Sequence, residues 1–498
     1  MPVFYRSCRA VLFHLLDELE VQSCTQDQTL IKALDFLRQC RAMHRDTLDE
    51  IVELDFASPR WQRLVLVQVE GQTGMNRRMF EACVFSYLAA GLQVGDLCVV
   101  GSEEYADYRE QLLDWEDCKP MLEEHCQAVG IPSEPDKFTQ QMKKWLSNTS
   151  KEVDRFLSSN DLLRLDANGR PSLRKLAKQI DPPGFKELEV DIQQQMPLRN
   201  LLEILNNVEK WTYFSRHFGP PSGADPKLAD PAERYATTVF TYGTFMGPHQ
   251  MAQHTDNLNE GVLLKTNRQH ITAEKLDAAL ADIVDTYAHF DLPYFWGTGG
   301  IAGADGTQFD SYRNNLKAES HIRYGGYGVM AYHHISDTYI ALFSHFIACG
   351  VWEAVYILDG LLKNRSEEVQ PQIVHADTQG QSLPVFGFAK LLGIDLIPRI
   401  RNWKDLTFYR ASLDEHYQTI DSLITAIIDW KLIETHWQDI MQVILSVRAG
   451  KIWPSTLLRK LGSYSHKNKL YRAFREFGNV VRTVALLGSR YFFRGLWR

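Results

Sequence analysis

The sequence lacks an apolar run long enough to cross a membrane. Its longest apolar stretches, such as residues 339–350, stop well short of the roughly 18 to 20 residues that a spanning helix requires. The N-terminal apolar segment meets Asp17, Glu18 and Glu20 without a small-residue cleavage site, so no secretory signal is predicted. We therefore expect a cytoplasmic protein that has no membrane partner.

The cysteines and histidines lack the spacing of metal sites. The eight cysteines contain no CxxC pair, so neither a zinc site nor a disulfide framework is predicted. The same holds for His333, His334, His345 and His375, which match no zinc-ligand spacing. The run GTGGIA (297–302) approximates a dinucleotide-binding fingerprint but precedes a strand instead of following one, which favours a simple turn.

Basic residues are outnumbered by acidic ones in the whole chain, but they are concentrated at its C-terminal end. The net charge is −8, yet residues 448–498 hold twelve Lys or Arg and a single acid, Glu476, so this tail carries +11 and the remainder −19. Binding DNA phosphates requires such a local cluster and not a basic average, although a solvated helix face is the common alternative. The apolar share of 45% excludes a disordered chain and indicates a globular protein.

The length of 498 residues allows roughly three domains. We expect a helical scaffold over 1–145, a helical linker and dimerisation region over 146–290, and a catalytic domain over 291–488. Strong turn signals, Asp181–Gly184 and Gly219–Ser222, each contain a Pro-Pro pair and mark candidate boundaries.

Between residues 296 and 401, short β-like runs alternate with helical ones, which is typical of an α/β layer. The predicted strands are 301–309, 328–333, 339–347, 372–376 and 396–400, and the predicted helices are 351–363 and 383–392. The order β-β-β-α-β-α-β is that of the ribonuclease H-like fold. Helices are then expected over 417–430 and 433–447, before a final basic helix over 467–487 with apolar residues at steps of three and four.

Three acids fit this layout as metal ligands. Asp305 lies in the first strand among small residues, Asp377 follows the fourth strand, and Glu476 comes from the last helix. Two Mg²⁺ ions held by such carboxylates could stabilise the attacking and leaving oxygens of a phosphodiester. Singly, each acid also has an ordinary structural explanation: an Asp-Gly turn, a helix cap, and an ion pair between Glu476 and Arg472.

Five ordered segments carry a family resemblance. They are ADGTQFD (304–310), YGVMAYHHISDTYIALFSHFI (327–347), HADTQGQ (375–381), FAKLLGIDLIPRIRNWKDL (388–406) and YRAFREFGNVVRT (471–483). Together they resemble the Tn-three family of replicative (class II) DDE transposases, with weaker similarity at 61–72 and 92–108. Relative to that family, we expect a member that is shortened at its N-terminus and truncated at its C-terminus.

The resemblance implies a bacterial, nucleoid-associated, Mg²⁺-dependent polynucleotidyl transferase, with Mn²⁺ as a substitute ion. Asp305, Asp377 and Glu476 fall on the family's three acid positions and would hold two metal ions in an α/β RNase H-like domain with a helical insertion at about 402–464. The implied reaction is nicking at transposon 3′ ends followed by strand transfer to target DNA, with a cointegrate product. We also expect a homodimer.

Candidate DNA contacts lie beside the fifth strand and in the last helix. They are Arg399, Arg401, Lys404, Lys467, Lys469, Arg472, Arg475 and Arg482. The alternative is a catalytically inactive remnant that acts only in DNA binding or dimerisation. A metal nuclease without strand transfer is a weaker alternative.

Overall fold

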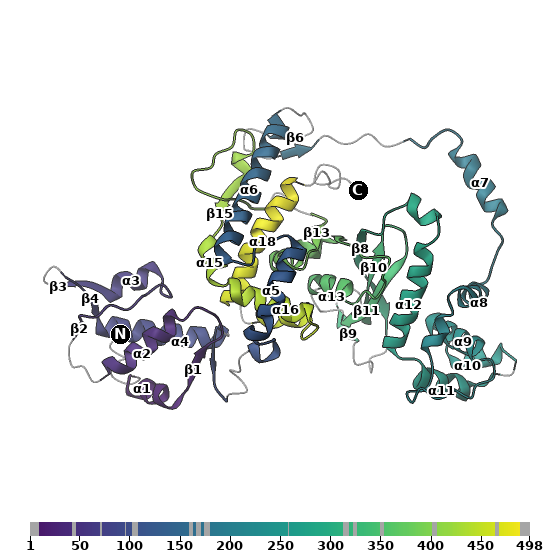
Figure 1. Cartoon of the computed structure of the whole chain (residues 1–498), viewed down its shortest axis with the longest axis horizontal. Helices are drawn as coiled ribbons and strands as arrows, with labels where there is room; N and C mark the ends of the chain where they lie inside the picture. Colours follow the sequence, from purple (N-terminus) through teal and green to yellow (C-terminus); the bar gives the residue numbers. More distant parts are fainter. Residues whose placement is uncertain are drawn as a thin grey trace.

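The computed structural model describes residues 9–41, 46–69, 72–94, 96–101, 108–158, 163–165, 171–173, 180–256, 258–311, 318–321, 326–348, 353–400, 406–463 and 468–488. Within these ranges, no helix is both long and apolar enough to span a bilayer. An N-terminal lobe lies beside a central body, and a group of helices at the opposite end is joined to the body by a strap that carries α7 (Figure 1).

The N-terminal lobe is a helical cluster that also contains two small sheets. Its elements are α1 Arg9–Glu18, β1 Val21–Ser23, α2 Thr29–Cys40, β2 Thr47–Leu48, α3 Pro59–Val65, β3 Leu66–Val69, β4 Gln72–Asn76, α4 Arg77–Val94 and β5 Leu97–Val99. β4 pairs with both β2 and β3, and β1 pairs with β5. The prediction of mainly helices missed these strands, although the two β-branched valines in the run LVQV of β3 favour extended backbone.

Polar contacts join this lobe to the central body. The Lys469 ammonium lies 2.5 Å from a carboxylate oxygen of Asp27, and the Lys469 backbone N–H donates to Asp96 at 2.7 Å. The Gln26 N–H donates to both carboxylate oxygens of Asp439, at 3.1 and 3.0 Å. The lobe is therefore held on the body through charged groups.

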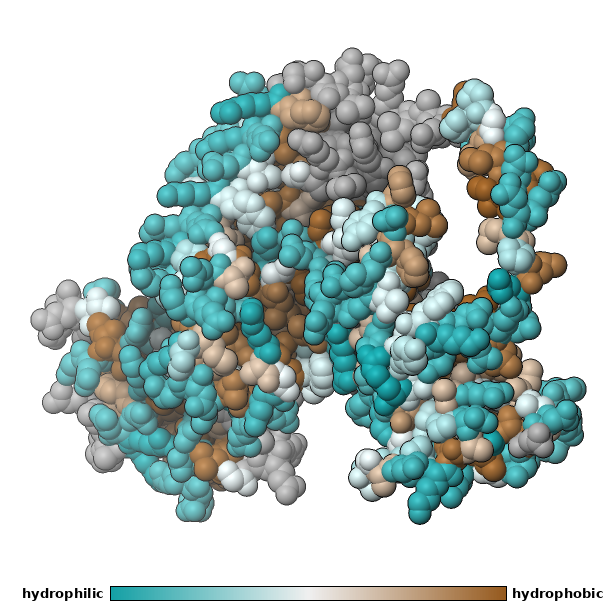
Figure 2. Space-filling model, turned by 45° about the vertical axis from the view of Figure 1, so that its right-hand side comes forward, coloured by the Kyte–Doolittle hydropathy of each residue, from teal (hydrophilic) through white to brown (hydrophobic). Residues whose placement is uncertain are grey.

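The outlying region is helical. Its elements are α7 Phe185–Gln195, α8 Leu201–Thr212, α9 Pro231–Gly243, α10 Pro248–Gln253, α11 Glu260–His270 and α12 Ala273–Ala288; the short pair β6 Leu163–Leu165 and β7 Pro171–Leu173 precedes them. Phe214, Phe218 and Tyr235 form a small separate core. Helix α7 buries no residue, and Figure 2 shows apolar residues exposed along its strap.

A six-stranded mixed sheet lies between α12 and the central helices (Figure 1). Its strands are β8 Ile301–Asp310, β9 Glu319–His321, β10 Gly326–Ser336, β11 Ala341–Ala348, β12 Ile373–Ala376 and β13 Asp395–Pro398. The spatial order is β11-β10-β8-β12-β13, with β9 beside β10. β8, β10 and β11 are antiparallel, whereas β12 is parallel to both β8 and β13. This confirms the predicted meander followed by two helix–strand units.

Two helices connect the later strands, α13 Ile357–Leu362 and α14 Leu383–Leu391. The helix predicted over 351–363 is shorter than expected, because Glu353–Tyr356 forms a 3₁₀ turn before α13. Val355 and Tyr356, a β-branched and an aromatic residue, have weak α-helix propensity. Residues 351 and 352 lie outside the described ranges.

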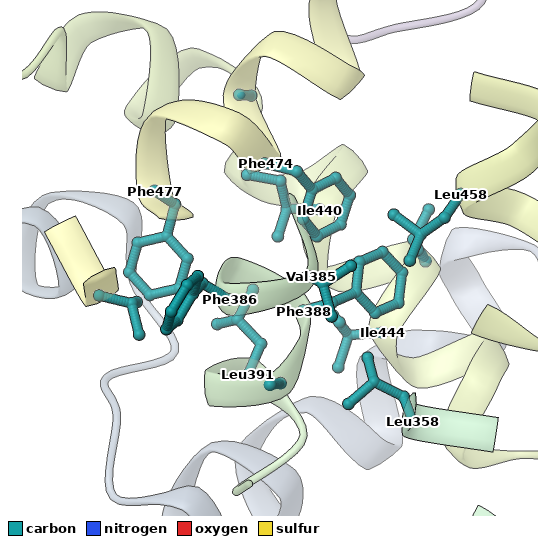
Figure 3. Packing of buried hydrophobic residues seen from close by; sticks show 14 of the residues in the cluster. Leu358, Val385, Phe386, Phe388, Leu391, Ile440, Ile444, Leu458, Phe474 and Phe477 are labelled. Carbon is teal, nitrogen blue, oxygen red and sulfur yellow. The ribbon is translucent and has the colours of Figure 1, made fainter. Parts of the chain in front are cut away.

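Helix α18, Lys469–Gly488, packs on α14 and forms the centre of the main core. Figure 3 shows Phe386 and Phe388 of α14 beside Phe474 and Phe477 of α18. The rings of Phe388 and Phe474 stack with their centroids 4.5 Å apart. The final amphipathic helix predicted from apolar spacing is thus confirmed as a buried element.

The central helices α5 Trp115–Val129 and α6 Pro135–Ser158 belong to the same core. Phe138 of α6 stacks on Trp437 at a centroid distance of 4.1 Å and also contacts Phe477 of α18. Residues far apart in the sequence therefore surround α18 on several sides.

The segment between β13 and α18 mixes helices with strands. It contains β14 Phe408–Arg410, β15 Ile424–Ile427, α15 Trp430–Thr435, α16 Trp437–Arg448 and α17 Pro454–Ser463. The helix predicted over 417–430 was wrong, since β15 pairs in parallel with β14. The Asp154 carboxylate accepts the N–H groups of residues 418 to 420, which holds this stretch against α6 instead of in a helix.

Candidate active site

Asp305 and Asp377 follow the same rung of the parallel ladder between β8 and β12. Ala304 pairs with Ala376 at the last rung of this ladder, and each aspartate is the next residue along its strand. The Asp305 carboxylate is exposed and accepts the backbone N–H of Gly306 at 2.8 Å, and Asp377 is half-buried. The structure therefore places these two predicted acids on neighbouring strands.

Arg399 extends this row by one strand. Ala376 pairs with Pro398 on β13, so Arg399 follows the same rung, and its backbone N–H donates to the Ala376 carbonyl at 2.8 Å. The Arg399 side chain is exposed. Two carboxylates and a guanidinium thus follow the same rung on three adjacent strands, of which β12 and β13 end there while β8 continues to Asp310.

On the other side of β8, Asp305 pairs with His333 of β10. The His333 ring accepts or donates a 2.7 Å hydrogen bond between Nδ1 and the Ser344 hydroxyl of β11. A half-buried imidazole therefore neighbours Asp305 in the sheet.

Tyr332 and Glu353 are two residues near the acids that the sequence analysis missed. Tyr332 pairs with Gly306 and is buried. Burial raises the pKa of its phenol well above the usual range, and the negative charges of Asp377, Glu353 and Asp305 raise it further. An acid at the start of the helix that follows the third strand was the one available signal for Glu353.

Glu476 occupies a different position. One carboxylate oxygen accepts the Asp429 N–H at 2.8 Å and the other accepts from the Asn479 amide at 3.2 Å. Gly478 and Phe474 face α14, where a Cβ on Gly478 would overlap Leu383. At about 100° per residue, Glu476 lies roughly 200° around the helix from both, so it projects away from α14.

The structure consequently brings together two of the three predicted acids. Among the residues it describes, no group of three His, Cys, Asp or Glu side chains is arranged to hold a metal ion. Asp305 and Asp377 nevertheless present hard oxygen donors from adjacent strands, which is the donor chemistry that Mg²⁺ requires. The sequence also allowed an ion pair between Glu476 and Arg472. In the structure, the Glu476 carboxylate instead accepts hydrogen bonds from Asp429 and Asn479.

The predicted DNA contacts fall into several environments. Arg472 and Arg475 are exposed on α18. Lys469 is engaged with Asp27, and Arg482 donates to the Thr407 carbonyl at 3.0 Å while burial lowers the pKa of its guanidinium. Three further predicted contacts lie outside the described residues: Arg401, Lys404 and Lys467.

Other candidate sites have structural explanations. His334 is buried and hydrogen-bonded through Nε2 to the Ile357 carbonyl at 2.9 Å, and burial lowers its pKa to about 4. The glycine-rich run before β8 forms a turn in which the N–H groups of Thr298 and Gly299 donate to the Asp337 carboxylate. It is therefore no dinucleotide site.

Comparison with known proteins places the chain in a family. The model of the Tn3 transposase DDE domain matches residues 203–491. Relatives include the transposase for transposon Tn501 of Pseudomonas aeruginosa, 30% identical over 95% of this chain and 47% of the relative. The transposase for transposon gamma-delta of Escherichia coli (strain K12) is 27% identical over 97% of this chain and 48% of the relative.

The transposase for transposon Tn1546 of Enterococcus faecium is 26% identical over 95% of this chain and 47% of its own length. The chain thus spans about half the length of the curated relatives that it matches. Because the DDE-domain model covers more than half of its residues, the chain belongs to the Tn3 transposase family, a group of DDE polynucleotidyl transferases.

Proposed function

We propose that this chain carries out metal-dependent DNA strand nicking at transposon 3′ ends and transfer of those ends to target DNA, in replicative, cointegrate-forming transposition. The proposed catalytic unit is an RNase H-like domain over 291–488 with an insertion at about 402–464. The sheet order β11-β10-β8-β12-β13, with three antiparallel strands and two parallel ones, supports that fold.

The row Asp305–Asp377–Arg399 is the observation that carries the proposal. Residues that follow one rung of a parallel ladder lie side by side. Asp377 and Arg399 do so at the edge where β12 and β13 end, next to Asp305 within β8. A phosphodiester at that edge would meet two metal-binding carboxylates and one exposed guanidinium, which suits the planar oxygens of a phosphate.

Divalent cations at this edge, Mg²⁺ or substituting Mn²⁺, would supply charge neutralisation to the attacking and leaving oxygens. Asp305 and Asp377 would hold them, and Arg399 would orient the phosphate. Because water or a 3′ hydroxyl is the attacking group, no covalent link between protein and DNA is proposed.

Glu476 is the third acid that the family resemblance implies, and we retain it as part of the proposal. Its participation requires that its carboxylate leave the Asp429 N–H and that α18 turn relative to α14. DNA would lie along the exposed Arg399, Arg472 and Arg475, on the bacterial nucleoid, and the chain would act as a homodimer.

Strand cleavage tests the proposal directly. The purified chain is incubated with labelled end DNA of transposon Tn501 and Mg²⁺ or Mn²⁺, alongside Asp305→Asn, Asp377→Asn and Glu476→Gln. Asp310→Asn, an exposed acid on the same strand, is the matched control. Nicked and joined products should appear with the wild type and the control and disappear with both aspartate variants; equal products from every protein would refute the catalytic assignment.

The second candidate is a catalytically inactive chain that binds DNA or dimerises without cutting. The observation that favours it is the separation of Glu476 from the two aspartates, since the bonds to Asp429 and Asn479 already satisfy its carboxylate. DNA retention without products in both metals, including for the wild type, would support this candidate.

A further inference from the structure

We propose that His333 of β10 binds the DNA strand beside Asp305, where its Nε2–H donates a hydrogen bond to a phosphodiester oxygen. The inference rests on the proposed function, because it names a further residue of the same site. The pairing of His333 with Asp305, the exposure of this pair and the hydrogen bond that holds the imidazole carry the assignment.

The row Asp305–Asp377–Arg399 extends in the other direction onto β10 and β11. Asp305 pairs with His333 of β10, and His333 pairs with Ser344 of β11. Asp377 and Arg399 continue the row just past the ends of β12 and β13. His333 therefore lies beside Asp305 on the side away from Asp377 and Arg399. A DNA strand that crosses the acids along the row would meet a nitrogen donor on either side of them.

The row lies on the open face of the three antiparallel strands. Residues paired across antiparallel strands point to the same face, with their Cβ atoms about 5 Å apart. Asp305 and Ser344 are exposed and His333 is half-buried, whereas the neighbouring rung that contains His334 is buried against the core. The His333 imidazole is thus directed toward solvent beside the Asp305 carboxylate.

This face leaves space for a DNA backbone. Gly303 lies two residues before Asp305 on the same face and is exposed. A Cβ added to Gly303 would come no closer than 4.0 Å to the described part of the chain, its two sequence neighbours aside. A glycine at such a point lets a ligand approach the strand closely. A phosphate can therefore reach the row without displacing a side chain at this position.

Ser344 holds the imidazole in one orientation. Its hydroxyl lies 2.7 Å from Nδ1 of His333. With the hydroxyl as the donor, the ring proton lies on Nε2, which then points away from β11 as a hydrogen-bond donor. A ring held in advance loses less freedom when a ligand binds. Since a phosphate oxygen is a charged acceptor and binds a neutral donor strongly, the neutral imidazole is sufficient for this contact.

Protection of the imidazole from chemical modification tests the contact in the unmutated full chain. Diethyl pyrocarbonate modifies accessible histidines, and tandem mass spectrometry reads each one with and without a DNA duplex that carries an end of transposon Tn501, in Mg²⁺. His333 should react in the free protein and lose most of its reactivity on DNA. His249, an exposed histidine of α10, should react equally in both samples, and the buried His334 in neither.

DNA affinity of variants gives a second measurement. Fluorescence anisotropy with the same duplex compares His333→Ala, His333→Gln and Ser344→Ala with the wild type, and His249→Ala is the matched control. His333→Ala should weaken binding by about tenfold, the size expected for one hydrogen bond to a charged group. His333→Gln retains an N–H donor near the Nε2 position and should recover most of the affinity. Ser344→Ala frees the ring to rotate and should fall between His333→Ala and the wild type.

The outcomes separate this contact from the proposed reaction. If the wild type nicks DNA but His333 stays reactive on DNA, or if His333→Ala binds DNA as tightly as the wild type, the contact is refuted and the proposed function stands. If His333 is protected and His333→Ala binds weakly while the wild type produces no nicks, the contact holds and the proposed catalysis fails. An unprotected His333 in a chain that does not nick DNA refutes both.

Discussion

Gly478 of α18 lies directly against the backbone carbonyl of Leu383, at the start of α14. A side chain at this position would overlap that carbonyl, so the two helices can approach this closely only because residue 478 is glycine. The contact also sets the rotation of α18 about its axis and, with it, the direction in which Glu476 projects.

Replacing Gly478 with alanine should therefore destabilise the fold. We expect Gly478→Ala to lower the free energy of unfolding by about 2 kcal/mol or more, a typical cost of overpacking a core. Gly243→Ala is the control, since nothing lies within 4 Å of a Cβ at this helical glycine. Urea unfolding curves in which the two variants coincide would contradict the predicted contact.

Lys469 should contribute to stability more than to DNA affinity. Burial raises the pKa of the Asp27 carboxyl, but the Lys469 ammonium and the hydroxyl and N–H of Thr29 together outweigh it and lower the pKa to about 2. Lys469→Met should thus cost about 2 kcal/mol at neutral pH, and the loss should shrink as pH falls from 4 toward 2. Denaturant titrations at several pH values provide the measurement.

Arg475, by contrast, is an exposed residue of α18 and should act through DNA. Arg475→Ala should leave the unfolding free energy within about 0.5 kcal/mol. It should weaken binding to all DNA sequences alike. The slope of log affinity against log salt should become shallower by about one, the change expected when one phosphate contact is lost. An unchanged slope in fluorescence anisotropy titrations would exclude Arg475 from the DNA surface.

The buried imidazole of His334 should make stability fall in acid. Its pKa is lowered by burial to about 4, whereas the unfolded chain protonates near 6.5. The unfolded state therefore binds the proton first, and about 3 kcal/mol of stability should be lost as pH falls through this window. His334→Gln, which keeps a donor for the Ile357 carbonyl, should flatten that part of the pH–stability curve relative to the wild type.

Asp96 should have the opposite effect on stability in acid. Burial raises its pKa to about 6, so the folded state takes up a proton before the unfolded state does. Its contribution to stability should rise as pH falls from 7 to 4. Asp96→Asn removes the charge and retains an acceptor for the Lys469 N–H, so we expect a more stable protein at pH 7 and a smaller difference at pH 4. Equal differences at both pH values would contradict this.

The sequence predicted the sheet and the placement of Asp305 and Asp377 on neighbouring strands, because both depend on local patterns. Apolar strand runs separated by helical ones indicate parallel connections, and residues that follow parallel strands leave one edge together. The position of Arg399 directly after the fifth strand was predicted for the same reason, and its contact with DNA stays a prediction.

The surroundings of Glu476 and Lys469 could not be predicted in this way. The direction of Glu476 depends on the contact of Gly478 with Leu383, and the partner of Lys469 lies in the N-terminal lobe. Both are long-range contacts that apolar spacing and charge counts do not encode. The strand at Ile424–Ile427 likewise depends on pairing with β14 and on hydrogen bonds to Asp154.

The joint between the N-terminal lobe and the body, built from Asp27, Asp96, Asp439 and Lys469, makes the chain's architecture sensitive to ionic strength. Salt that competes for DNA phosphates will also loosen the attachment of the lobe. A salt titration of DNA binding on the whole chain therefore reports two equilibria, and the Lys469→Met variant separates them, because it weakens the joint before any salt is added.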